Sequence, residues 1–386
     1  MKLSTHPFWL VGFRPFFALA CLSGLSLPVL WVLVYLGEIS GPHITFTLMQ
    51  WHAHEMFFGF GWAVLGGFLL TATKNWVGVR GYHGNALIFL SGAWLFERIG
   101  MWWESDWPTL LFTLSNYLFL TAILAMLLRT LLSPRRGDAF RDNLVFVLFL
   151  PLFLIAKYLM LSEEHFQHGW SMTLGLFRMA FLVMLERTLT QFMKNAFQVA
   201  ILRNSMLDGA IKLLGGVLVF VGWLPPDVAV LVFALLASLL LLRLAFWHPQ
   251  RALRRLDIGI MYLGYLALAA QLLIEVLAWG GHSAWVGGVS VHLFTFGVMG
   301  LIIPAMMIRI SNGHTGRPVK FDGIDKTVLR IALLAFVLRI VAPQFFPAGY
   351  AIWLALAALC WCLVFSILGW RYIPHLLQPR VDGKEH

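Results

Sequence analysis

The stretch ITFTLMQWHAHEMFFGFGWAVLGGFLLTAT, residues 44–73, has the length and apolar character of a helix that crosses a membrane. It also carries His52, His54 and Glu55 in its first half. Ionisable side chains inside a bilayer are costly unless they are paired, hydrated or bound to a metal, so they are rare and usually functional. The stretch therefore predicts both a membrane-spanning fold and a polar site within that fold.

The composition of the whole chain also indicates an integral membrane protein. Of its 386 residues, 60% are hydrophobic and only 12% are charged, whereas soluble domains have about 45–50% apolar and about 25% charged residues. Apolar runs separated by short breaks recur along the whole length, and by their length we expect an all-α polytopic bundle of about twelve transmembrane helices. The expected cores are 16–36, 47–73, 84–103, 108–131, 143–161, 170–190, 208–223, 227–246, 258–279, 288–309, 327–342 and 349–370.

The domain organisation follows from the same pattern. We expect a single integral membrane domain over residues 1–386, without a separate soluble domain and without a cleavable signal peptide, because the first apolar run is long and others follow at once. A duplication into six-helix halves, 1–193 and 208–386, would suit the span count, although the halves do not align residue by residue. The three cysteines lie within expected spans, so no disulfide framework is predicted.

Membrane topology, rather than nucleic-acid binding, explains the net charge of +10. Lysine and arginine are concentrated in every second connection between spans, and acidic residues in the other connections. By the positive-inside rule, both termini and the basic connections are predicted to be cytoplasmic. The basic clusters are Lys74/Arg80, Arg135/Arg136/Arg141, Lys194/Arg203, Arg251/Arg254/Arg255, Arg317/Lys320 and Arg371/Arg380.

The two histidines of the second span point in different directions on a regular helix. His52 and His54 are about 200° apart at about 100° per residue, so they cannot easily ligate one metal ion, whereas His52 and Glu55 share a face. We expect one imidazole to bind a metal and the other to serve a second centre or to hydrogen-bond Glu55 or a carbonyl. The alternative is that both are hydrogen-bonded packing residues.

Polar side chains are expected at similar depth in other spans. His292 opens the run VHLFTFGVMG at 291–300, whose glycines leave room for a flat ligand or another helix. Together with His52 and His54, it supplies the partner that a bis-histidine haem or a histidine-rich copper site would need. So many costly groups at one depth indicate a polar cavity or a bound cofactor. The other such groups are Glu97, Arg98, Lys157, Arg178 and Glu275.

A second polar group is expected at the cytoplasmic end of the bundle. Arg14 stands out in it, because it lies in an aromatic run where the positive-inside rule requires no charge. The members of the group are His6, Arg14, Lys74, Arg80, His83, His314 and Arg317. Arginines there could clamp haem propionates, and a loop histidine could ligate the iron. The alternative is a set of positive-inside loops with incidental histidines.

Three motifs in this order resemble the NnrS family. They are GFRPFF at residues 12–17, WHAHEM at 51–56 with its continuation through Phe60 to Asn75-Trp76, and GHTGRP at 313–318 after the His292 helix. The resemblance implies a multi-pass protein of the bacterial inner membrane that contains haem and copper and acts in nitric oxide metabolism. By position it marks His52, His54, Glu55, His292, His314, Arg14 and Arg317 as the polar positions of the family.

Depth and chemistry then assign roles to these positions. The four histidines are candidate metal ligands for one or two b-type haems, with copper also possible, and the arginines are candidate partners of the cofactor. Glu55 is the candidate catalytic proton donor. One expected function is binding and detoxification of nitric oxide, with possible reduction to nitrous oxide by electrons from a quinol or another donor.

Two other functions are consistent with the sequence. The protein could transport a metal, haem or small anion through a histidine-rich cavity, or it could sense or sequester nitric oxide without catalysis. The expected partners are nitric oxide, membrane lipids and an electron donor, and no nucleic acid.

Overall fold

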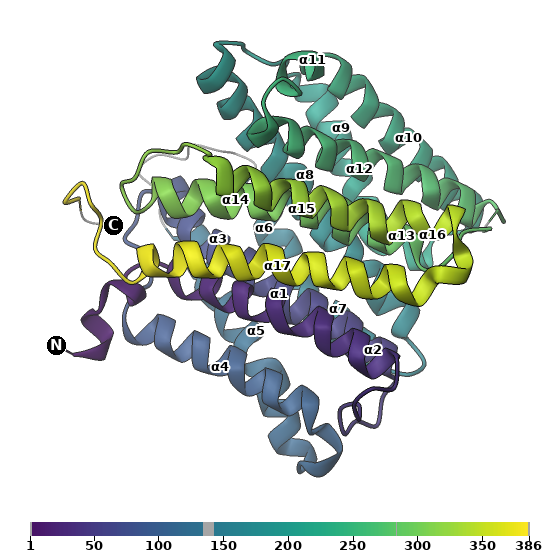
Figure 1. Cartoon of the computed structure of the whole chain (residues 1–386), viewed down its shortest axis with the longest axis horizontal. Helices are drawn as coiled ribbons and strands as arrows, with labels where there is room; N and C mark the ends of the chain where they lie inside the picture. The colour runs from purple at the N-terminus through teal and green to yellow at the C-terminus, as the bar shows by residue number, and fades with distance from the viewer. Residues whose placement is uncertain (1, 134–142, 283, 385–386) are drawn as a thin grey trace. The chain divides into compact units, whose positions relative to one another are not determined.

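The computed structural model describes residues 2–133, 143–282 and 284–384, and within these ranges it is helical with no β-strand (Figure 1). This confirms the predicted all-α fold. The basic cluster of Arg135, Arg136 and Arg141 lies outside the described residues.

Ten helical segments of the described chain are long and apolar enough to cross a membrane, and each coincides with an expected span. The remaining two expected spans, 84–103 and 170–190, correspond to α4 (Asn85–Trp102) and α8 (Phe166–Phe197), which contain two and four charged residues and are not among the ten. The polytopic bundle is therefore confirmed. The ten segments are α1 (Phe13–Tyr35), α2 to α3 (Leu48–Val77), α5 (Thr109–Leu132), α6 with α7 (Asn143–Leu161), α9 with η5 (Ser205–Trp223), α10 (Pro226–Ala245), α12 (Leu256–Trp279), α13 to α14 (Val289–Gly313), α15 to α16 (Gly323–Phe345) and η8 with α17 (Pro347–Leu376).

The chain divides into two compact units. Unit 1 comprises Met1–Gly169, Met307–Lys320 and Phe365–His386, and unit 2 comprises Trp170–Met306 and Phe321–Val364. Three of the four boundaries between them fall inside α8, α14 and α17, and the fourth, between Lys320 and Phe321, lies in the loop after α14. The single membrane domain and the two possible sequence halves, 1–193 and 208–386, stay predictions.

Both ends of the chain lie at the same end of unit 1 (Figure 1). Arg14, in the first turn of α1, donates hydrogen bonds to the carbonyls of Leu376 at 2.7 Å and Gln378 at 2.6 Å. The backbone N–H of Val381 donates to the carbonyl of Thr315 at 3.0 Å, which holds the C-terminal tail against the loop after α14. The cytoplasmic location of this end stays a prediction.

Local signals in the sequence set the limits of the second span. Thr47 and Gln50 form a reciprocal capping box, in which the Gln50 N–H donates to the Thr47 hydroxyl and the Thr47 N–H donates to the Gln50 side chain. At the other end, α3 (Trp62–Val77) stops at Gly78, whose φ of 67° is left-handed and suits glycine. The span is therefore a continuous helical segment between two strong end signals.

Three segments of the described chain are π-helical: η3 (Glu55–Gly61), η6 (Leu293–Met299) and η7 (Val337–Val341). The first two begin directly after His54 and His292, the last residues of α2 (Leu48–His54) and α13 (Val289–His292). A π-helical turn takes in an extra residue, so it rotates the side chains that follow, and it is frequent at functional sites. The structure thus departs from regular helix geometry next to two of the candidate ligands.

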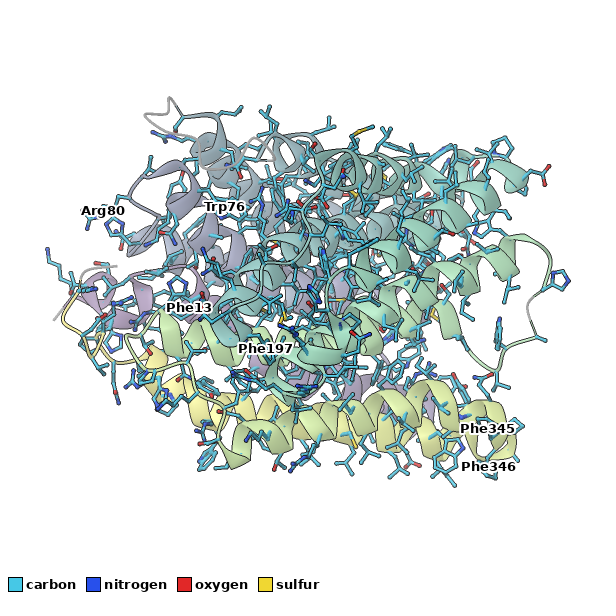
Figure 2. The ribbon with its side chains drawn as sticks, turned by 90° about the horizontal axis from the view of Figure 1, so that it is seen from above. Phe13, Trp76, Arg80, Phe197, Phe345 and Phe346 are labelled. Atoms are coloured by element: carbon cyan, nitrogen blue, oxygen red, sulfur yellow. The ribbon has the colours of Figure 1, made fainter. Side chains whose placement is uncertain are left out.

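Exposed aromatic rings lie at one end of a helix of unit 2. Phe345 and Phe346, at the end of α16 (Ala342–Phe345), are 73% and 65% exposed, and Figure 2 shows both rings at the periphery. Aromatic side chains are common at the boundary between lipid and water. The position of these rings agrees with a membrane-spanning segment that ends there.

Close packing of α1 against α3 supports unit 1 and depends on glycine. A Cβ atom on Gly67 would lie 2.7 Å from the Cβ of Phe16 and 3.4 Å from the Cα of Phe13. Neither atom can move without a shift of the α1 backbone, so the two helices can approach this closely only while residue 67 lacks a side chain.

Gly67→Ala should therefore lower the thermal stability of the purified protein, by a free energy on the order of 1–3 kcal/mol that is typical of overpacking. The measurement is the fraction of protein that remains monodisperse in detergent after heating. Gly92→Ala is the matched control, since a Cβ atom at this exposed helical position would meet nothing within 4 Å. Equal stability of the two variants would contradict the packing argument.

Candidate functional site

Charged side chains from several helices meet in the interior of unit 1. Those of His54, Glu97 and Lys157 have no exposed surface, and those of Glu55 and Arg98 are 4% and 12% exposed. Two carboxylates and two cations balance, so the group is neutral when the imidazole is neutral. We call this group the buried cluster; its members are His54 of α2, Glu55 of η3, Glu97 and Arg98 of α4, Asn116 of α5 and Lys157 of α7 (Leu152–Leu161).

Glu97 is the centre of the buried cluster. Its Oε1 accepts a hydrogen bond from the Lys157 ammonium and lies 2.8 Å from Arg98 Nη2 and 3.4 Å from His54 Nε2. Its Oε2 is buried and has no hydrogen-bond partner in the part of the chain that the structure describes. One oxygen of this carboxylate is therefore crowded by donors, while the other is able to accept a proton or a ligand.

The imidazole of His54 lies between two carboxylates. Its Nδ1 is 3.3 Å from Glu55 Oε1, and its Nε2 is 3.4 Å from Glu97 Oε1 and 3.5 Å from the side-chain amide of Asn116. A neutral ring can donate to Glu55 and accept from Asn116, and a protonated ring can donate to both carboxylates. Both protonation states therefore have partners in the same geometry.

His52 and His54 have different neighbours, as the helical spacing predicted. The His52 ring stacks on Trp31 of α1 with 4.1 Å between ring centroids, and His54 belongs to the buried cluster. That Glu55 shares the face of His52 stays a prediction. Glu55 begins the π-helical segment η3, and its carboxylate lies 2.8 Å from Arg98 Nη1 beside His54.

Aromatic rings and a glycine surround the two cations. The Lys157 ammonium lies 5.4 Å from the ring centroid of Phe58, and the Arg98 guanidinium lies 5.4 Å from that of Trp94, within the range of cation–π attraction. A Cβ atom on Gly59 would lie 2.3 Å from Arg98 Nη1, so a glycine makes room for this side chain. The sequence shows these residues one by one, but their spacing does not predict that they meet.

His314 lies at the terminal end of unit 1 and is half-buried. Burial, and then the positive charges of Lys74, Arg380 and Arg14, lower the pKa of its imidazole to about 4, so the ring is neutral at pH 7. Within the described residues its ring nitrogens make no hydrogen bond, and the ring packs 5.5 Å from that of Phe13. A neutral imidazole surrounded by cations is thus available at this position.

Two of the predicted arginines contact the C-terminal segment. Arg14 is completely buried, and its bond to the carbonyl of Leu376, the last residue of α17 (Tyr350–Leu376), caps the negative end of that helix, while its second bond goes to the carbonyl of Gln378 beyond it. Arg317 Nη2 donates to the side-chain carbonyl of Gln378 at 2.9 Å. Figure 2 places Phe13, the neighbour of Arg14, toward this end of unit 1, together with Arg80.

His292 belongs to unit 2, and its neighbour is an arginine that the sequence reasoning missed. Its Nδ1 lies 2.7 Å from the carbonyl of Gly288, and Arg339 Nη2 lies 3.1 Å from Nδ1 and 3.2 Å from Nε2. Arg339 is 6% exposed and lies in η7. Its signal in the sequence was a charge inside the expected span 327–342. Shared ligation by His292 and the histidines of unit 1 stays a prediction.

The described residues contain no group of three or more His, Cys, Asp or Glu side chains that could hold a metal ion. Haem needs only one or two axial imidazoles. Individual histidines therefore stay candidates for haem, and the copper ligands stay a prediction.

The fold and the site together define a polytopic α-helical membrane protein with a charged cluster buried in its first unit. The chain matches the model of the NnrS family, described as NnrS protein, over residues 7–380. It therefore belongs to the NnrS family, which confirms the resemblance of its motifs. No curated protein matches the chain.

Because the buried cluster is balanced in charge, removal of one charge should cost more than removal of two. Glu97→Gln leaves two cations against Glu55, and loss of one partner of a buried pair typically costs about 3–5 kcal/mol. The double variant Glu97→Gln/Lys157→Met restores the balance and should be the more stable of the two in the heating assay. Glu164→Gln, at an 87% exposed side chain, is the control and should behave as wild type. A Glu97→Gln variant that is as stable as this control would show that the charges are not coupled.

Proposed function

We propose that this chain is a haem-containing protein of the bacterial inner membrane that binds nitric oxide and reduces it, with the buried cluster as the source of protons. Membership of the NnrS family, the ten apolar segments and the polar side chains inside the bundle support this proposal. The observation that carries it is the position of His54 between two carboxylates, where either protonation state finds partners.

His314 is the histidine best suited to ligate haem. Its neutral ring makes no hydrogen bond within the described chain, whereas both ring nitrogens of His54 face groups of the buried cluster. The cations around His314 suit propionates, because arginine and lysine bind carboxylates through charge-assisted hydrogen bonds. When bound, haem would supply the metal that binds nitric oxide and would pass to it the electrons of a separate donor. The cations proposed to hold it are Lys74, Arg317 and Arg380.

The buried cluster supplies the complementary property, which is storage of protons in an apolar environment. Reduction of nitric oxide to nitrous oxide and water consumes one proton for each electron, so a protein that performs it inside a membrane needs an internal donor. His54 links Glu55 to Glu97, and Glu97 Oε2 is the acceptor without a partner among the described residues. In this proposal Glu55 is one of two linked proton carriers.

The haem assignment predicts a spectral difference between two histidine variants. Purified wild-type protein should show a Soret band, and His314→Ala should lose most of it. His43→Ala is the control, because His43 pairs with Asp106 in a loop and its side chain is 58% exposed. A full Soret band in His314→Ala would overturn this ligand, and loss of the band in His52→Ala instead would move the haem to His52.

The proton role predicts a loss of turnover at constant haem content. The charge-balanced variant Glu97→Gln/Lys157→Met should keep its haem but reduce nitric oxide at least about tenfold more slowly, because the loss of an internal proton donor would limit the supply of protons to the haem. The measurement is nitrous oxide formed with a chemical reductant, compared with Glu164→Gln. Unchanged turnover would make the cluster structural, and a wild-type protein that binds nitric oxide without reducing it would be a sensing or sequestering protein.

A further inference from the structure

Arg178 is an arginine of unit 2 that the proposed function does not use. It lies in α8, inside an expected span, and is only 2% exposed. Among the described residues its guanidinium makes no hydrogen bond or ion pair, and its buried Nε has no partner. Its aromatic neighbour is the ring of Phe233, 5.6 Å from Cζ. A buried cation without acceptors is expensive, so this position indicates a group that supplies them.

A set of polar side chains on α12 and α13 lies within electrostatic range of Arg178. Glu275 acts on Arg178 through its charge. The Oε1 atom of Glu275 accepts from Gln271 Nε2 at 3.1 Å and also from the Ser290 hydroxyl. Gln271 is completely buried, and no described residue donates to its Oε1. This part of unit 2 thus contains a donor without an acceptor and an acceptor without a donor.

The charges restrict what could complete this set. Arg178 and Glu275 together are neutral, so an oxyanion would gain from the arginine but be repelled by the carboxylate. A neutral ligand whose ring carries carbonyl or hydroxyl groups avoids this conflict. Either oxygen accepts a hydrogen bond from arginine, and a hydroxyl also donates one to an amide oxygen.

The surroundings favour a flat ligand that arrives through lipid. The rings of Phe233 and Trp279 lie 6.4 Å apart between centroids and offer an aromatic surface beside the polar set. Leu273 and Leu277, on the same helix as Glu275, are 44% and 42% exposed, as expected where a helix faces lipid. The ligand is therefore flat, neutral, oxygen-bearing and soluble in the bilayer.

We propose that Arg178, Gln271 and Glu275 bind the headgroup of a membrane quinol or quinone. Arg178 donates to one oxygen attached to the ring, and Gln271 Oε1 accepts from a hydroxyl of the quinol. The site deepens the proposed function, since it rests on that function for the use of quinol as electron donor. Binding itself needs neither haem nor nitric oxide.

The test measures binding of a short-tailed quinone, decylubiquinone, to the purified full-length protein by equilibrium ultrafiltration. Two variants address the site: Gln271→Leu, which keeps the size of the side chain, and Arg178→Gln/Glu275→Gln, which keeps the charge neutral. Each should bind roughly tenfold to a hundredfold more weakly, as expected for the loss of hydrogen bonds to buried polar or charged groups. Arg330→Gln, at an exposed arginine of unit 2, should bind as wild type.

Each outcome decides the proposal. Absence of quinone binding by wild type, equal binding by folded site variants, or binding of nitrite in place of quinone would overturn it, and size-exclusion profiles identify variants that have not folded. Turnover with a chemical reductant separates the two proposals. If the wild-type protein reduces nitric oxide but binds no quinone, the proposed function stands and this site is overturned. If it binds quinone but does not reduce nitric oxide, the site stands and the proposed function is overturned.

Discussion

The pairing of Glu97 with Lys157 and Arg98 is the interaction on which unit 1 depends. Each of these charges would be costly alone in an apolar interior. Together they are tolerated because the carboxylate forms ion pairs with the two cations. The pairing joins α4 to α7 and, through Arg98 and Glu55, to the second span. It also fixes the surroundings of His54, so the packing of the helices and the chemistry of the candidate site follow from one balance of charge.

Departures from regular helix geometry accompany this balance. The π-helical segment η3 begins at Glu55, directly after His54, and η6 follows His292 in unit 2. Wider turns of this kind shift the side chains that follow them away from their positions on a regular helix, and they are frequent at functional sites. The proposed haem position at His314 differs in character, because the C-terminal tail and the ends of α1 and α3, rather than span interiors, lie beside this residue.

Several functional features could be predicted from single segments. The span positions followed from length and hydropathy, and the family from three short motifs. The divergence of His52 and His54 followed from helical spacing alone. The role of Arg14 could not be predicted in this way, because its partner carbonyls lie at Leu376 and Gln378, more than three hundred residues later in the chain.

The sequence by itself determined the helical membrane fold, because the hydropathy and length of each segment are local properties that the bilayer selects. It also showed which ionisable residues lie inside spans. Tertiary structure alone decided which of them meet: Glu97 with Lys157, His54 between two carboxylates, and His292 beside Arg339. The physical reason is that these pairs come from different helices, so they depend on how the helices pack and rotate, and spacing along one helix carries no information on that.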